Sequence, residues 1–84
     1  MEDTQQRVFD IVKLKVAEVL IDVDPVRITR EASLVDLGAN SIDRVEVAMS
    51  SMEELGLDIP GSALHGVKNI GELVDALSRH LEGE

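Results

Sequence analysis

A serine lies where the sequence changes from a loop pattern to a helical one. Ser41 directly follows Asn40 within residues 36–44, DLGANSIDR. A hydroxyl at this position has three possible roles: it caps the helix, it acts as a nucleophile, or it is the attachment point for a group added by another enzyme. Ser and Asn are both preferred N-cap residues, so capping is the simplest interpretation.

A catalytic serine needs a base within hydrogen-bond reach, and the sequence contains no recognisable motif that would supply one. His65 and His80 lie in no motif, and Ser41 lacks the flanking glycines of a G-x-S-x-G elbow. We therefore expect no catalytic residue, and we expect both histidines at the surface or at the edge of the core. Modification stays open, because the N-terminus of a helix favours an attached phosphate.

The composition excludes several classes of partner. The 84 residues include 17 acidic and 8 basic side chains, which give a net charge of −9. Nucleic acid and anionic membranes are therefore poor partners, whereas basic protein surfaces are good ones. Cysteine is absent, which excludes disulfides and thiolate-bound metals. Neither a signal peptide nor a membrane-spanning run is present, and we expect a cytoplasmic protein.

One acidic run is similar to the beginning of a calcium-binding loop. The residues DVDP start at Asp22. A loop of the EF-hand type needs Gly at its sixth position and Glu at its twelfth, and Arg27 and Ser33 stand there instead. We therefore expect no metal site.

Three apolar stripes with helical spacing predict three long helices. Their expected ranges are about 4–20, 41–55 and 70–81. The residues expected to face the core are Val8, Phe9, Val12, Val16, Val19 and Leu20 in the first helix, Ile42, Val45, Met49 and Met52 in the second, and Ile70, Leu73, Val74, Leu77 and Leu81 in the third.

Capping signals support these helix ends. Asp3 with Gln6 predicts a capping box for the first helix, and Asn69 with Glu72 predicts one for the last. Gly56 supplies the left-handed residue that ends the second helix in a Schellman motif.

The segment 21–40 has no regular periodicity but carries apolar residues that can hold it against a core. We expect these to be Val26, Ile28, Leu34, Val35 and Leu37. Asp24 and Ser33 could each open a short turn. A short fourth helix is expected near residues 62–65, between Pro60 and Gly66. The predicted fold is therefore all-α: a small bundle of three long helices and one short helix, with a long ordered loop between the first two.

The central segment DLGANSIDRVEVAMSSMEELGLDIP resembles the acyl carrier protein family, whose attachment motif is D-x-G-x-[DN]-S-[LI]-[DE]. The order and length of the expected helices agree with that family over nearly the whole chain. The resemblance implies that Ser41 accepts the 4′-phosphopantetheine arm of coenzyme A from a carrier-protein synthase, a phosphopantetheinyl transferase. Asp36, Gly38 and Asn40 complete the motif beside it, with Asn40 in place of the commoner Asp.

The second helix also carries an acidic strip. Asp43, Glu46 and Glu53 lie at spacings that place them along one side of a helix, beside Val47 and Ser50. Such a charge run is often no more than a solvated surface. In acyl carrier proteins the corresponding helix is the main recognition surface. The resemblance therefore implies that partner enzymes bind Asp43, Glu46, Val47 and Glu53, with Arg44 as a selective contact.

The runs LGANSIDR and GVKNIGELVDAL are similar to the donor carriers of polyketide β-branching cassettes. This resemblance implies a non-catalytic carrier that holds acetyl as a thioester, with an acyltransferase, a ketosynthase-type decarboxylase and an enzyme resembling hydroxymethylglutaryl synthase as partners. General fatty-acid or peptidyl carriers remain alternatives, and so does a helical interaction domain without a prosthetic group. We expect one carrier domain over residues 1–84, frayed at 82–84, that is discrete and monomeric. A domain excised from a larger synthase would have the same sequence.

Overall fold

The computed structural model describes residues 3–64 and 66–83. Its first helix, α1, spans Thr4–Val19. Asp3 is its N-cap and accepts the backbone N–H of Gln5 at 3.0 Å. The predicted capping box is wrong, because the Gln6 side chain donates to Asp10 at 2.9 Å instead of reaching back to the cap. The predicted stripe is confirmed. Its fully buried members are Val8, Val12 and Val16, and Phe9, Val19 and Leu20 pack at the edge of the core.

The long loop after α1 is ordered by short turns. Asp24 accepts the Val26 N–H at 3.1 Å and opens the 3₁₀ helix η1, Pro25–Arg27, as predicted. Ile28 is buried and holds the loop to the core. The same role predicted for Val26 and Val35 is wrong: both side chains are mostly exposed, because each lies on the outer side of a turn.

The second helix, α2, spans Ser41–Leu55 and ends as predicted. Gly56 has a left-handed backbone, with φ +72°, and its N–H donates to the Glu53 carbonyl at 3.2 Å. The Leu57 N–H donates to the Met52 carbonyl at 2.8 Å, which completes the Schellman motif.

The short helix predicted near residues 62–65 is a single 3₁₀ turn, η2, Gly61–Leu64. His65 lies outside the described residues, as does Glu84 at the end of the predicted frayed tail. The last helix, α3, spans Ile70–Leu81, and Asn69 caps it by accepting the Glu72 N–H at 2.8 Å. The Glu72 carboxylate accepts the N–H of Lys68 and not that of Asn69, so the predicted box is shifted by one residue.

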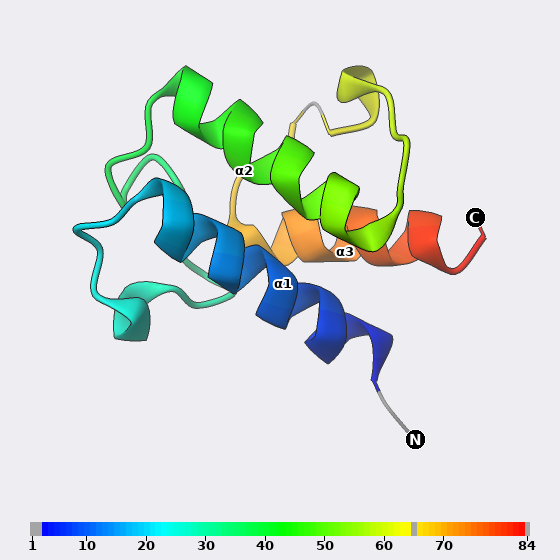
Figure 1. Ribbon diagram of the computed structural model, residues 1–84, viewed down its shortest axis with the longest axis horizontal. Helices are drawn as coiled ribbons and strands as arrows, with labels where there is room; N and C mark the ends of the chain where they lie inside the picture. The colour runs from blue at the N-terminus through cyan, green and yellow to red at the C-terminus, as the bar shows by residue number, and fades with distance from the viewer. Residues whose placement is uncertain (1–2, 65, 84) are drawn as a thin grey trace.

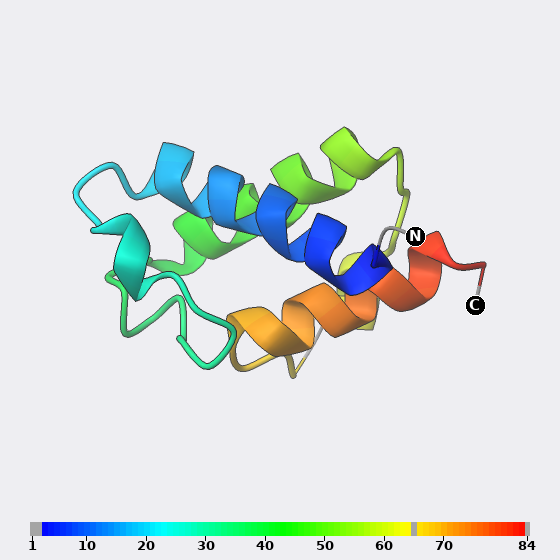
Figure 2. The same cartoon turned by 90° about the horizontal axis from the view of Figure 1, so that it is seen from below.

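The three α-helices form the predicted all-α bundle, and no strand occurs in residues 3–64 and 66–83. α1 runs opposite to both α2 and α3 and packs against each of them, as Figures 1 and 2 show. α2 and α3 touch each other much less. The core therefore lies around α1, and the space between α2 and α3 is only partly filled. The buried apolar cluster comprises Val8, Val12, Val16, Ile28, Leu37, Val47, Ile59, Ile70, Leu73, Val74 and Leu77.

The long loop also completes the N-terminus of α3. The first N–H groups of a helix have no partner within the helix. Here the Ile70 N–H donates to the Ala32 carbonyl at 2.9 Å, and the Gly71 N–H donates to the Arg30 carbonyl at 2.8 Å. The Arg30 guanidinium in turn donates to the Gln5 side chain at 2.6 Å. These bonds join the loop to α1 and α3 and keep it ordered.

Within the described part of the chain, no helix combines the length and the apolar character that crossing a membrane would require.

Candidate functional site

A tight turn delivers the chain to the start of α2. The Ser33 hydroxyl accepts the Val35 N–H at 3.1 Å, and the Ser33 carbonyl accepts the Leu37 N–H at 3.1 Å, which confirms the predicted turn. Gly38 follows with φ +98°, a backbone conformation that favours glycine. Leu37 and Ala39 are buried on either side of it and fix the direction in which the chain enters the helix.

Asn40, and not Ser41, caps α2. The Asn40 side chain accepts the Asp43 N–H at 2.8 Å, and the Asp43 carboxylate accepts the Asn40 N–H at 3.2 Å. This reciprocal pair is a capping box. Ser41 is therefore the first residue inside the helix. It is exposed, and its hydroxyl makes no hydrogen bond with any of the described residues. The simplest interpretation of the sequence, a structural cap, thus applies to Asn40 and leaves the Ser41 hydroxyl free.

The described structure places no histidine base beside Ser41 that would make it a catalytic nucleophile of this chain. His80 is exposed in the last turn of α3, at the opposite end of the bundle from the start of α2 (Figure 1). His65 lies outside the described residues. Across residues 3–64 and 66–83, no three His, Cys, Asp or Glu side chains are grouped so that they could hold a metal ion.

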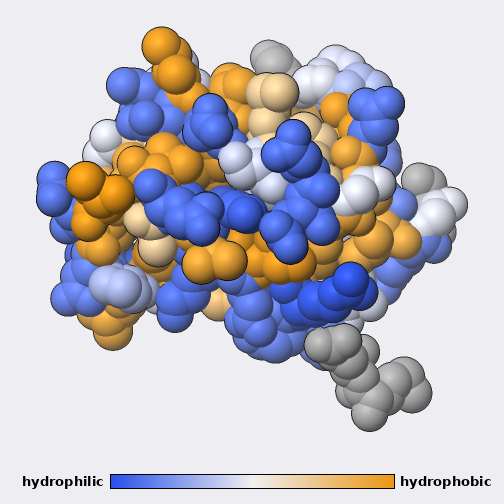
Figure 3. All heavy atoms as spheres, in the orientation of Figure 1, coloured by the Kyte–Doolittle hydropathy of each residue, from blue (hydrophilic) through white to orange (hydrophobic). Residues whose placement is uncertain are grey.

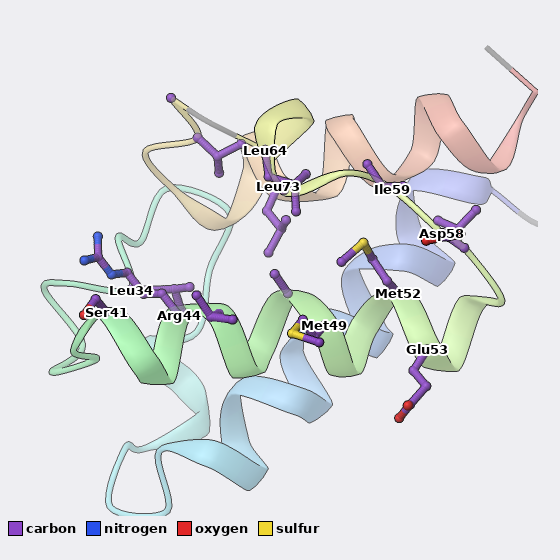
Figure 4. Close-up of a pocket in the computed structure, with 16 residues that line it drawn as sticks. Leu34, Ser41, Arg44, Met49, Met52, Glu53, Asp58, Ile59, Leu64 and Leu73 are labelled. Atoms are coloured by element: carbon purple, nitrogen blue, oxygen red, sulfur yellow. The ribbon is translucent and has the colours of Figure 1, made fainter.

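An open groove of about 760 Å³ begins at Ser41 and follows α2. Figure 4 shows Ser41 and Arg44 at one end, Met49 and Met52 along the floor, and Leu64 and Leu73 on the opposite wall. The groove exists because α2 and α3 make few contacts and the segment between them contains only the short turn η2. Its lining is largely apolar: Leu34, Val45, Ala48, Met49, Met52, Leu57, Ile59, Leu64, Val67 and Leu73.

The direction predicted for the α2 stripe is wrong. Ile42, Val45 and Met49 are 76%, 56% and 59% exposed, and only Met52 packs at the edge of the core. The face of α2 that meets the core instead carries Val47 and Ser51, both fully buried. We call Ile42, Val45 and Met49 the apolar strip. Figure 3 shows apolar surface among hydrophilic side chains on the face formed by α1 and α2.

The predicted partner contact at Val47 is wrong as well, because this residue lies on the face of α2 that meets the core. Val47 is 0% exposed and packs in the core, so no partner can touch it. Glu46 and Glu53 are exposed, and Glu46 accepts a bond from the Ser50 hydroxyl at 3.4 Å. Asp43 is half-buried, because its carboxylate is part of the cap.

The other charged residues of the site differ in their surroundings. Glu54 forms an ion pair with Lys15 of α1 at 3.4 Å and joins the two helices. Arg44 is exposed and lines the groove beside Ser41. Asp36 is also exposed, and its backbone N–H lies 3.5 Å from the Ser33 hydroxyl. The roles predicted for Asp36, Gly38 and Asn40 toward a bound group remain predictions.

Comparison with known proteins agrees with this geometry. Residues 10–77 match the family described as phosphopantetheine attachment site. The polyketide biosynthesis acyl-carrier-protein AcpK of Bacillus subtilis is 45% identical over 73 residues, which cover 87% of this chain and 89% of that protein. An acyl carrier protein of Clostridium perfringens is 39% identical over 75 residues, with coverage of 88% and 97%. Another, from Porphyromonas gingivalis, is 32% identical over 83 residues, with coverage of 98% and 100%.

Proposed function

Because this chain belongs to the acyl carrier proteins with a phosphopantetheine attachment site, we propose that Ser41 is its attachment residue. The prosthetic group of the chain is covalently bound 4′-phosphopantetheine. In the proposed reaction, Ser41 Oγ forms a bond to the phosphorus of coenzyme A that carries the pantetheine chain, the pyrophosphate bond breaks, and adenosine bisphosphate leaves. The serine proton passes to a base of the carrier-protein synthase. When bound, the group supplies a terminal thiol that holds an acyl unit as a thioester.

The observation that carries this proposal is the free hydroxyl of Ser41. Asn40 and Asp43 supply the helix cap, so modification of Ser41 removes no hydrogen bond that holds α2 together. The hydroxyl is exposed at the mouth of the groove, where another enzyme can reach it. The attached phosphate would also lie at the positive end of α2, where anions are favoured by about 0.3–1 kcal/mol at exposed sites.

Intact-mass measurement tests the assignment. The protein is incubated with coenzyme A, magnesium and a broad-specificity carrier synthase, and we expect a mass increase of one phosphopantetheine. Ser41→Ala should show none, whereas Ser50→Ala, a second serine of α2, should be modified like the wild type. A folded wild-type protein that gains no mass would refute the proposal, and so would modification of Ser41→Ala. A helical interaction domain without a prosthetic group would give the first of these results.

The apolar strip and the acidic residues next to it form the proposed partner-binding surface. Ile42, Val45 and Met49 offer apolar area, and Glu46 and Glu53 offer charge for basic patches on the partner. The strip adjoins the attachment point, so an enzyme that binds it can also receive the arm. Arg44 is the proposed selective contact. The protein acts in this scheme as a monomeric, non-catalytic carrier in the cytoplasm.

For the pathway, we propose that the carrier presents acetyl for polyketide β-branching. The NSIDR run that ends at Arg44 supports this role, and so does the similarity to a polyketide biosynthesis carrier. An acyltransferase and a ketosynthase-type decarboxylase would load acetyl, and an enzyme resembling hydroxymethylglutaryl synthase would use it. General fatty-acid and peptidyl carriers are the alternatives.

The acetyl-loaded protein can be tested directly with such a synthase and a second carrier that holds a β-ketoacyl group. The mass of the second carrier should increase by one acetyl unit plus one water, because hydrolysis of the acetyl thioester leaves a free carboxylate on the branched product. Loaded carriers of fatty-acid synthesis serve as the comparison and should react more slowly. If both donors react equally, the β-branching role is refuted, and the carrier role is untouched.

A further inference from the structure

Two cationic side chains lie at the end of the groove that holds Ser41. A small hollow of about 50 Å³ continues the groove there and shares Leu34, Arg44, Val67 and Leu73 with it. Lys68 lines the hollow as well. The chain has only 8 basic residues against 17 acidic ones, and two of the 8 line this hollow.

Arg44 lies one helical turn after Ser41, on the same side of α2. Residues three apart in a helix have Cβ atoms about 5–6 Å apart. Long side chains in helices also point back toward the N-terminus. Figure 4 shows this orientation, with the Arg44 guanidinium directed toward the end of α2 that carries Ser41. The cationic group is thus placed where a group joined to Ser41 Oγ would begin.

Arg44 has no anionic partner within the described part of the protein. The ion pairs within 4.0 Å there all involve Lys15. Asp43, the nearest carboxylate in the sequence, is already engaged with the Asn40 N–H in the helix cap. The residue before Ser41 is Asn40, an amide, so no second carboxylate there competes for the Arg44 guanidinium. Arg44 is therefore available to an anion from outside the folded chain.

We propose that Arg44 binds the phosphodiester joined to Ser41 and so acts as a positioning residue for the start of the prosthetic arm. This inference rests on the proposed function of Ser41. The planar guanidinium can donate two parallel hydrogen bonds to phosphate oxygens. Lys68 is the second basic residue that lines the hollow beside Arg44. The acyl unit, at the other end of the arm, is not the group that Arg44 contacts.

The consequence is a coupling between modification and folding. The contact exists only in the folded, modified protein, so attachment should stabilise the wild type more than it stabilises Arg44→Gln. An exposed ion pair of this kind should change the unfolding equilibrium constant by about 2- to 5-fold at low salt. The difference should shrink as salt is raised, because the pair is solvent-exposed.

The test compares apo and modified forms of four proteins: wild type, Arg44→Gln, Arg44→Lys and Arg79→Gln. Arg79 is an exposed arginine in the last turn of α3, at the other end of the bundle (Figure 1). Arg79→Gln therefore removes the same charge far from Ser41 and serves as the control. Complete modification is verified by mass. Unfolding in urea gives the apo-to-modified ratio of unfolding constants, and phosphorus NMR gives the resonance of the phosphodiester.

We expect a smaller apo-to-modified ratio and a shifted phosphorus resonance in Arg44→Gln than in the wild type. Arg44→Lys should give intermediate values, and Arg79→Gln should match the wild type. Equal ratios and unshifted resonances in wild type and Arg44→Gln would overturn the inference. A wild-type protein that cannot be modified would instead overturn the proposed function, so the two failures are distinguishable by mass alone.

Discussion

Separate replacement of Asn40 and Ser41 should have different effects: Asn40→Ala should lower the stability of the fold, and Ser41→Ala should abolish modification. Asn40→Ala removes the side chain that accepts the Asp43 N–H at 2.8 Å and leaves this half-buried donor to water. Loss of an N-cap of this type costs about 1 kcal/mol, within a range of about 0.5–2. For a domain of this size each kcal/mol lowers Tm by about 4–8 °C. Ser41→Ala removes an exposed hydroxyl that bonds to none of the described residues, and alanine is the better helix former by a few tenths of a kcal/mol.

Thermal and urea unfolding of the unmodified proteins measure this difference, with intact mass after incubation with the synthase as the second assay. Asn40→Ala should melt about 4–8 °C below the wild type and still be modified to completion. Ser41→Ala should melt within about 3 °C of the wild type and gain no mass, because the substitution changes stability by less than about 0.5 kcal/mol. Equal losses of stability in both variants would refute the assignment, since the Ser41 hydroxyl would then be part of the cap.

Three further predictions concern the core, the loop and the partner-binding surface. Ser51→Ala should raise the free energy of unfolding by about 1–2 kcal/mol, because the buried Ser51 hydroxyl has no hydrogen-bond partner among residues 3–64 and 66–83. Ser50→Ala, at a half-buried position, is the control, and a lower urea midpoint for Ser51→Ala would contradict the reasoning. Gly71→Ala should lower the urea midpoint, because a Cβ there would lie 3.0 Å from the Arg30 carbonyl oxygen. Relieving this close contact should cost about 1–3 kcal/mol, which exceeds the gain in helix propensity from Gly to Ala. Glu46→Lys should slow acyl transfer to partner enzymes and flatten its salt dependence, and transfer rates that stay unchanged at low salt would show that this charge plays no part in docking.

Local signals in the sequence were sufficient wherever a feature depends on neighbouring residues. The Schellman motif at Gly56 needs only one residue with positive φ and one apolar residue after it, and both were visible. The stripe of α3 was predicted correctly because its apolar positions are nearly all buried, Ile70 and Leu77 completely. A helix with a single apolar face of this kind leaves no ambiguity about which side meets the core.

The orientation of α2 could not be predicted in this way, because it carries two apolar faces. Periodicity identified Ile42, Val45 and Met49 as one face, but the buried residues of α2 include a serine, Ser51, which carries no apolar signal. Which face is covered depends on the distance between α2 and α3, and that distance follows from the packing of the whole bundle. The available signal was the short Gly- and Pro-containing segment after Gly56, which has too few residues to cover a second face.

The two ends of α2 explain how its outer face can remain uncovered. The capping box of Asn40 and Asp43 satisfies the N-terminus, and the Schellman motif at Gly56 satisfies the C-terminus. Val47 anchors the helix to the core. The helix is therefore held without burying its apolar strip. Exposed apolar area of this extent has no stabilising role in an isolated domain, but it can serve contact with other proteins. Because the strip begins at the residue after Ser41, an enzyme bound there lies next to the attachment point.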